Sequence, residues 1–105
     1  MDYQTAQNIA EVLKAVAHPV RLKIVELLEH GEHCVGEIVE KLEISQSIAS
    51  QQLGLMKDKR ILQCRREGTK VFYSIKNTNV IYLLHCVYDN CEQNHGTNSS
   101  SKKGR

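Results

Sequence analysis

The chain has 105 residues and a formal net charge of +2, with 41% hydrophobic and 25% charged residues. This length fits one domain, and the composition is that of an ordinary globular protein. No run of roughly 18 apolar residues and no signal peptide occurs, so we expect a cytoplasmic protein without a transmembrane helix. In that compartment the cysteines are expected to be free thiols rather than disulfides.

Two helices are predicted at the start of the chain. Over residues 4–17 the apolar positions recur at helical spacing, at Ile9, Val12, Leu13 and Val16. The residue before a proline is pushed out of the helical region, so the first helix should end at His18 and Pro19 should begin the second. The second helix should stop near Gly31. It has apolar residues that we expect to point largely inward, namely Leu22, Ile24, Val25, Leu27 and Leu28.

The middle of the chain has the pattern of a helix-turn-helix. A short third helix is predicted over residues 34–42 and a fourth over residues 46–57, with Glu43 and Ile44 as the turn. Ser45 is well placed as the N-cap of the fourth helix, because its hydroxyl can accept from a free backbone N–H.

The fourth helix has an unusual outward face. Exposed helix faces are normally covered by charged residues, but here the face is uncharged until Lys57. Short polar side chains suit the base edges in the major groove of DNA. We therefore expect Ile48, Ala49 and Leu53 to face the core. The candidates for base and phosphate contact are Gln46, Ser47, Ser50 and Gln51.

A β-hairpin is predicted after Arg60, where the segments ILQCRR and KVFYSI alternate in polarity around the loop EGT. From Lys57 to Lys70 six basic and two acidic residues give a net charge of +4, more than that of the whole chain. Such clustering is the electrostatic pattern that nucleic-acid binders need, but a charge cluster alone favours an ordinary solvated face. The residues expected to reach phosphates or the minor groove are Arg65, Arg66, Thr69 and Lys70.

A last helix is predicted over residues 78–92, and the polar, Gly- and Ser-rich residues 94–105 are expected to form a disordered tail. The fold class is therefore mainly α with a small β-hairpin (α+β), in the order of four helices, two strands and a helix. This order is that of a winged helix-turn-helix, in a single domain over residues 1–93.

Three segments, AHPVRLKIVELL, CVGEIVEKLEISQSIASQQLGLMKD and REGTKVFYSI, resemble the ArsR/SmtB family of bacterial and archaeal repressors. The resemblance extends roughly from residue 9 to 92. It implies a homodimer formed through the first and last helices. It also implies that the dimer binds a duplex DNA operator, which we expect to be an imperfect inverted repeat. The dimer would release this operator when an inducer binds to the protein. The family commonly has His where this chain has Gln52.

Thiols are the first candidates for sensing the inducer. Arsenic and cadmium sensors of the family have a Cys-Val-Cys pattern with further thiols at the start of the third helix. This chain keeps Cys34 there, but it has Gly36 at the second position and Val39 at the third. One thiolate beside His33 is an incomplete soft-metal site, and a structural role for Cys34 is favoured.

A thiol pair between the second and last helices is used by sulfide-responsive members of the family. Cys86 or Cys91 could supply the last-helix thiol, but Glu26 stands where its partner is expected. Cys34 could still approach one of them in a dimer. Cys64 is expected to be a small buried hydrophobe.

A zinc site on the last helix, as the family's zinc sensors have, is disfavoured. The corresponding positions all carry amides, which bind zinc poorly: Asn77, Asn79, Asn90 and Gln93. His85 and Asp89 share a helix face and are a candidate metal pair, although a surface pair without metal is favoured.

We therefore expect a sequence-specific DNA-binding repressor that a thiol-reactive signal releases: reactive sulfur, an oxidant, or a soft metal ion or metalloid. The candidate thiols are Cys34, Cys86 and Cys91, and no cofactor is required. A metal-responsive repressor with a His/Cys/Asp site on the last helix stays open as an alternative, as does a module that binds protein or RNA. An enzyme is disfavoured, because the histidines are scattered and no nucleophile elbow or phosphate loop occurs.

Overall fold

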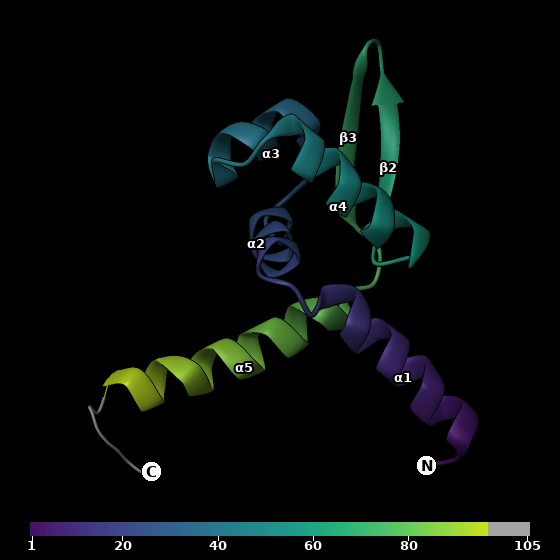
Figure 1. Cartoon of the computed structure of the whole chain (residues 1–105), viewed down its shortest axis with the longest axis vertical. Coiled ribbons are helices and arrows are strands. Elements are labelled where there is room, and N and C mark those ends of the chain that lie inside the picture. The colour runs from purple at the N-terminus through teal and green to yellow at the C-terminus, as the bar shows by residue number, and fades with distance from the viewer. Residues whose placement is uncertain (97–105) are drawn as a thin grey trace.

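The structure is a computed structural model that describes residues 1–96, and for residues 91–96 it describes the backbone alone. Its elements are α1 (Tyr3–Val16), α2 (Pro19–Leu28), β1 (His33–Cys34), α3 (Val35–Leu42), α4 (Gln46–Asp58), β2 (Leu62–Glu67), β3 (Lys70–Ile75) and α5 (Asn79–Gly96) (Figure 1). This order confirms the predicted winged helix-turn-helix. Among the described residues, no helix combines the length and the apolar character needed to cross a bilayer.

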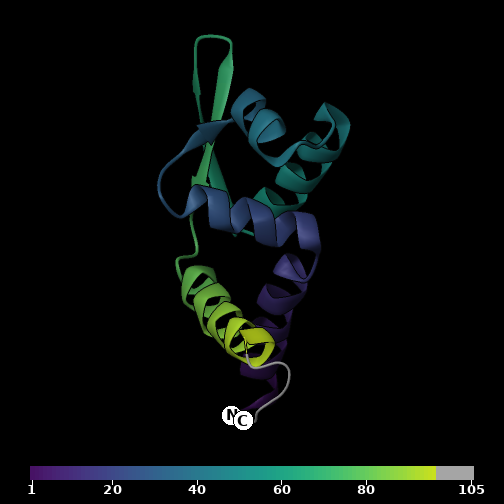
Figure 2. The ribbon, with the colours of Figure 1, turned by 90° about the vertical axis from the view of Figure 1, so that its left-hand side faces the viewer.

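The elements form two halves joined by α2. In both ribbon views α1 and α5 lie toward one end, where Figure 1 shows them running apart, whereas α3, α4 and the β2–β3 hairpin lie at the other (Figures 1 and 2). The hairpin, which we call the wing, projects away from α1 and α5. The wing is thus held beside α4, and α1 touches the far end of α4 through the ion pair between Glu11 and Lys59.

The sheet has one strand more than the sequence predicted. β1 pairs antiparallel with β3, with His33 opposite Tyr73 and Cys34 opposite Phe72, and the strand order is β1-β3-β2. A strand of two residues is too short to show an alternating pattern, and its partner lies far along the chain, so local pattern could not identify it. Cys34 ends β1 and is the N-cap of α3, which therefore begins one residue later than predicted.

The predicted helix starts are confirmed by their caps. The ring Nδ1 of His18 accepts a hydrogen bond from the Val20 N–H at 3.1 Å, and Pro19 follows in the first turn of α2. The Ser45 hydroxyl accepts from the Ile48 N–H at 3.1 Å. Each cap satisfies a backbone donor that the helix itself leaves free.

Helices α3 and α4 end in the same way, on a charged residue in the left-handed region. Glu43 after α3 has φ 55° and Arg60 after α4 has φ 64°. In each case the next N–H reaches back into the helix, from Ile44 to the Val39 carbonyl at 3.3 Å and from Ile61 to the Met56 carbonyl at 2.9 Å. This is the Schellman ending, for which glycine is the usual residue.

The last helix runs to Gly96, beyond the predicted end at residue 92. From residue 97 onward, the tail predicted over residues 94–105 lies outside the described residues.

The core lies between α2, α3, α4 and the base of the wing. Its fully buried side chains include Ile24, Ile38, Leu53, Met56 and Ile61. Two predictions of inward-facing residues are wrong: Leu22 is 38% exposed and Ile48 is 42% exposed. Helix α4 faces the core with Ala49, Leu53 and Met56, and Ile48 lies one residue off that line. Leu22 instead borders an apolar hollow between α1, α2 and α5.

Candidate nucleic-acid interface

The first turns of α4 present polar side chains to solvent. Gln46, Ser47, Ser50 and Gln51 are all exposed, as the sequence predicted. In the part of the chain that the structure describes, none of these four side chains forms a hydrogen bond or an ion pair. Their donors and acceptors are therefore available to a ligand. The N-terminus of the helix, capped by Ser45, lies at the same end.

The tip of the wing lies beside the start of α4. A hollow of about 330 Å³ joins the two elements, and it is lined by Cys34, Val35, Gly36, Gln46, Thr69, Lys70 and Val71. The side chains of Thr69 and Lys70 are exposed at this hollow, and that of Arg66 is exposed on the neighbouring strand β2. Gln46 of α4 and Lys70 of the wing thus line one concave surface.

Arg65 is arranged differently from the other wing residues. Its Nε donates to both carboxylate oxygens of Glu32, at 3.1 and 3.0 Å, and its Nη2 donates to Oε1 at 2.5 Å. Its guanidinium also lies 4.7 Å from the ring centroid of Phe72. These hydrogen bonds lower the pKa of Glu32 and raise that of Arg65. Arg65 therefore braces the wing against the segment before β1.

Strand alternation explains why the two neighbouring arginines differ. Arg65 stands opposite Phe72 and Arg66 opposite Val71, so the two arginines lie on opposite faces of the hairpin. Arg66 shares its face with Leu62, the buried anchor of β2. The sequence could not separate them, because the partner carboxylate of Glu32 lies 33 residues before Arg65.

The thiols occupy different surroundings. Cys34 is only 8% exposed, and its backbone N–H donates to Glu37 Oε1 at 3.0 Å, a bond that lowers the pKa of Glu37. Cys64 is only partly buried, less than predicted, and Cys86 is exposed on α5. The side chain of Cys91 lies outside the described residues. Cys34 adjoins α4 and the wing, whereas Cys86 belongs to the opposite half.

The candidate metal pair lies beside two carboxylates of α2. His85 and Asp89 share a hollow of about 260 Å³ with Glu26 and Glu29, and His85 Nε2 is 2.6 Å from Glu29 Oε2. The hydrogen bond with Glu29 and its charge raise the pKa of His85, with smaller contributions from Asp89 and Glu26. Within the described residues no group of three possible ligands converges on a metal position.

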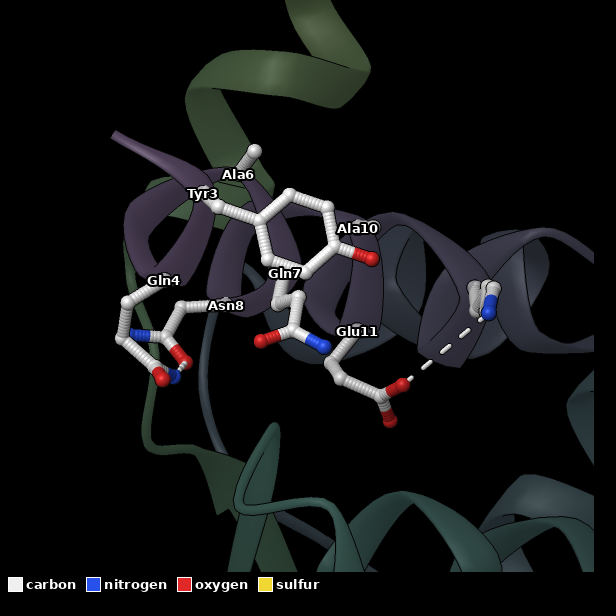
Figure 3. Close-up of a pocket in the computed structure, with 8 residues that line it drawn as sticks. Tyr3, Gln4, Ala6, Gln7, Asn8, Ala10 and Glu11 are labelled. Carbon is white, nitrogen blue, oxygen red and sulfur yellow. Dashed lines mark hydrogen bonds and ion pairs between the residues drawn. The ribbon is translucent and has the colours of Figure 1, made fainter. Parts of the chain in front are cut away.

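Two of the hollows along α1 differ in character. One of about 580 Å³ lies along the outer side of that helix and is lined by α1 side chains alone, mostly polar, among them Tyr3, Gln7 and Glu11 (Figure 3). A hollow lined by one helix has no groups converging from other elements, so it is a poor candidate site. The other, of about 350 Å³, is apolar and is lined by Leu13, Val16, Ala17, Leu22, Val25, Val80, Leu83, Leu84 and Val87.

Comparison with known proteins identifies the family. The pattern of the arsR family of bacterial regulatory proteins matches residues 18–63. The biofilm growth-associated repressor of Agrobacterium fabrum is 39% identical over 83 residues, which are 79% of this chain and 71% of that protein. The transcriptional activator HlyU of Vibrio cholerae is 40% identical over 97 residues, 90% of this chain and 87% of that protein.

Solved structures share the fold. The structure of HlyU from Vibrio cholerae has a TM-score of 0.76 and 32% identity, over 85% of this chain and 96% of that one. A homodimeric winged helix-turn-helix DNA-binding domain from Mycobacterium bovis, Mb0332, has a TM-score of 0.75 and 32% identity, over 89% and 88% of the two chains. The chain therefore belongs to the ArsR family of bacterial regulatory proteins, and it is a transcriptional regulator rather than an enzyme.

Proposed function

We propose that this protein is a homodimeric repressor that lays α4 in the major groove of an operator while the wing contacts the adjacent backbone. The observation that carries the proposal is the set of unpaired polar side chains at the start of α4, next to the exposed cations of the wing. A major groove about 12 Å wide admits one helix, and its base edges offer donors and acceptors to short polar groups.

The residues divide into two roles. Gln46, Ser47, Ser50 and Gln51 read base edges and bind nearby phosphates, because all four project from the outward face of α4. On the wing, Arg66, Thr69 and Lys70 bind phosphates or enter the minor groove. Arg65 contributes less to phosphate binding than the other wing residues, because its charge is already neutralised by the carboxylate of Glu32.

The apolar surface of α1 and α5 supports a twofold dimer. Leu13 and Val87 are exposed at the apolar hollow, and further exposed hydrophobic side chains of the two helices are Ile9, Tyr82 and Tyr88. Patches of this kind mark protein–protein contacts. The similar domain from Mycobacterium bovis is described as homodimeric. A symmetric dimer presents two α4 helices and therefore binds an operator with two half-sites, expected to be an imperfect inverted repeat.

We propose that a thiol-reactive signal releases the operator, and the position of Cys34 supports this. Its side chain borders the hollow between α4 and the wing, so a group added to its sulfur would occupy the space between the two DNA-binding elements. Cys86 is the most accessible thiol among the described residues. Exposure of the DNA complex to polysulfide, hydrogen peroxide or arsenite, with Cys34→Ser, Cys86→Ser and Cys91→Ser variants, identifies the responding thiol.

The DNA proposal is tested on a duplex that the protein selects from a randomised library, with binding followed by fluorescence anisotropy at several salt concentrations. Arg66→Ala and Lys70→Ala should each weaken binding on all sequences and reduce the salt slope by about one. Arg65→Ala is the matched control and should change the slope less. Gln46→Ala or Ser47→Ala should relax base preference, by about 1–3 kcal/mol at one position. A protein that selects no duplex and stays monomeric contradicts the proposal.

A further inference from the structure

One side chain of α2 joins α1, α2 and α4. Arg21 Nε donates a hydrogen bond to Gln52 Oε1 on α4 at 2.6 Å. Its Nη1 lies 3.3 Å from the carbonyl oxygen of Lys14 and 3.4 Å from that of Ala15, both at the end of α1. The guanidinium therefore connects the helix proposed to bind DNA with a helix proposed to form the dimer.

The acceptor, Gln52, is unusual in its burial. At 8% exposed it is the single polar residue that is buried among the described side chains, and it lies between Ala49 and Met56 on the inward face of α4. A buried amide costs free energy unless it is hydrogen-bonded, whereas an apolar side chain would fill this space without that cost. A short hydrogen bond to a guanidinium has a defined direction, which apolar packing lacks.

The α1 end of the connection is also directional. The last carbonyls of a helix have no partner within it, and Arg21 supplies donors to two of them. A second link joins α1 and α4 where α4 ends, through Lys59 Nζ and Glu11 Oε1 at 3.3 Å. That ion pair is solvent-exposed and so contributes little. The Arg21–Gln52 bond is the more enclosed of the two links.

We infer that Arg21 and Gln52 are positioning residues that fix α4 relative to α1, and thereby set the distance between the two α4 helices of the dimer. The inference rests on the proposed function, since it needs a dimer that binds two half-sites. Neither residue contacts DNA in this arrangement, because Gln52 points inward and Arg21 lies on α2 behind it. The trait that the pair controls is selectivity for half-site spacing, which is a geometric property of the dimer.

The test uses the duplex selected by the unaltered protein, together with versions that have one base pair added or removed between the half-sites. The unaltered protein should prefer the selected spacing by about tenfold or more, and Arg21→Met and Gln52→Met should reduce that preference to about threefold or less. Both variants should keep the salt slope of binding, because the wing is unchanged. Arg21→Lys keeps the charge without the planar fork and should show an intermediate preference.

Two controls separate positioning from folding and from charge. Lys23→Met removes an exposed cation from the same helix and should leave the spacing preference intact. Gln52→Glu keeps an acceptor for Arg21 and should also preserve it. All variants are compared as dimers with native circular dichroism. Met variants that fold and dimerise yet keep the full spacing preference overturn the inference. If the unaltered protein selects no duplex, the proposed function fails and the inference with it.

Discussion

The two halves of the molecule differ in how well they bury their own apolar residues. In the half built from α2, α3, α4 and the sheet, the large side chains that meet at the centre are fully buried. In the half built from α1 and α5, leucine, isoleucine, valine and tyrosine side chains stay exposed, and two of them, Leu13 and Val87, line an apolar hollow. The comparison teaches that the first half forms its own hydrophobic core, and we call it the complete half. The other half has an apolar surface suited to contact with a second copy of the chain.

The largest expected effect comes from opening a cavity in the complete half. Leu53→Ala removes a fully buried side chain of α4 and should lower the free energy of unfolding by about 2–5 kcal/mol, a large part of the stability of a small domain. Urea unfolding followed by circular dichroism measures this loss. Leu55→Ala is the matched control on the same helix, because Leu55 is exposed, and it should cost less than about 1 kcal/mol. Equal losses in the two variants would contradict the place of Leu53 in the buried core of this half.

A charge placed in the half built from α1 and α5 should weaken dimerisation rather than folding. Leu13→Glu introduces a carboxylate beside the apolar hollow, and burying it unpaired in a dimer should cost on the order of 3 kcal/mol, or about a hundredfold in the dimer dissociation constant. Sedimentation equilibrium measures the constant, and circular dichroism should show that helix content is kept. Lys14→Glu serves as the control, because Lys14 is already polar and exposed. A dimer that Leu13→Glu leaves intact would place the interface elsewhere.

The complete half also contains local strain that can be relieved. Glu43 ends α3 with φ 55°, a conformation that costs most L-residues about 1–2 kcal/mol and costs glycine almost nothing. After the extra entropy of glycine in the unfolded chain is subtracted, Glu43→Gly should raise the free energy of unfolding by up to about 1 kcal/mol. Glu40→Gly, within α3, should lower it by about the same amount. Thermal unfolding of both variants checks the two opposite signs, and a loss of stability in Glu43→Gly would be the contrary result.

The smallest effect concerns the contact between the halves, where His85 of α5 meets Glu29 of α2. The pKa of His85 is raised in the folded state, mainly by its hydrogen bond with Glu29. The contact therefore stabilises fully below the ordinary histidine pKa of about 6.5, and this contribution is lost as the pH rises through the raised pKa. His85→Gln should be less stable than the unaltered protein at acidic pH, and the difference should vanish in alkaline solution. A difference that grew with pH would contradict the assignment.

Features set by neighbouring residues were predictable from the sequence, and features set by distant ones were not. The start of α2 at Pro19 and the cap at Ser45 follow from local chemistry, and so do the exposed polar residues at the start of α4. The strand at His33 and Cys34 depends on pairing with β3, and the separation of Arg65 from Arg66 depends on Glu32. The outward position of Ile48 depends on which side of α4 the core covers.

The third strand has a consequence for the shape of the bound duplex. Because β1 runs directly into α3 and pairs with β3, backbone hydrogen bonds tie the hairpin to the helix-turn-helix, and we expect the two to move together. A rigid DNA-binding unit must bind a duplex whose groove width already matches it, or bend the DNA until the groove width matches. We therefore expect base pairs that no side chain touches, at the centre of the operator, to influence affinity through their deformability.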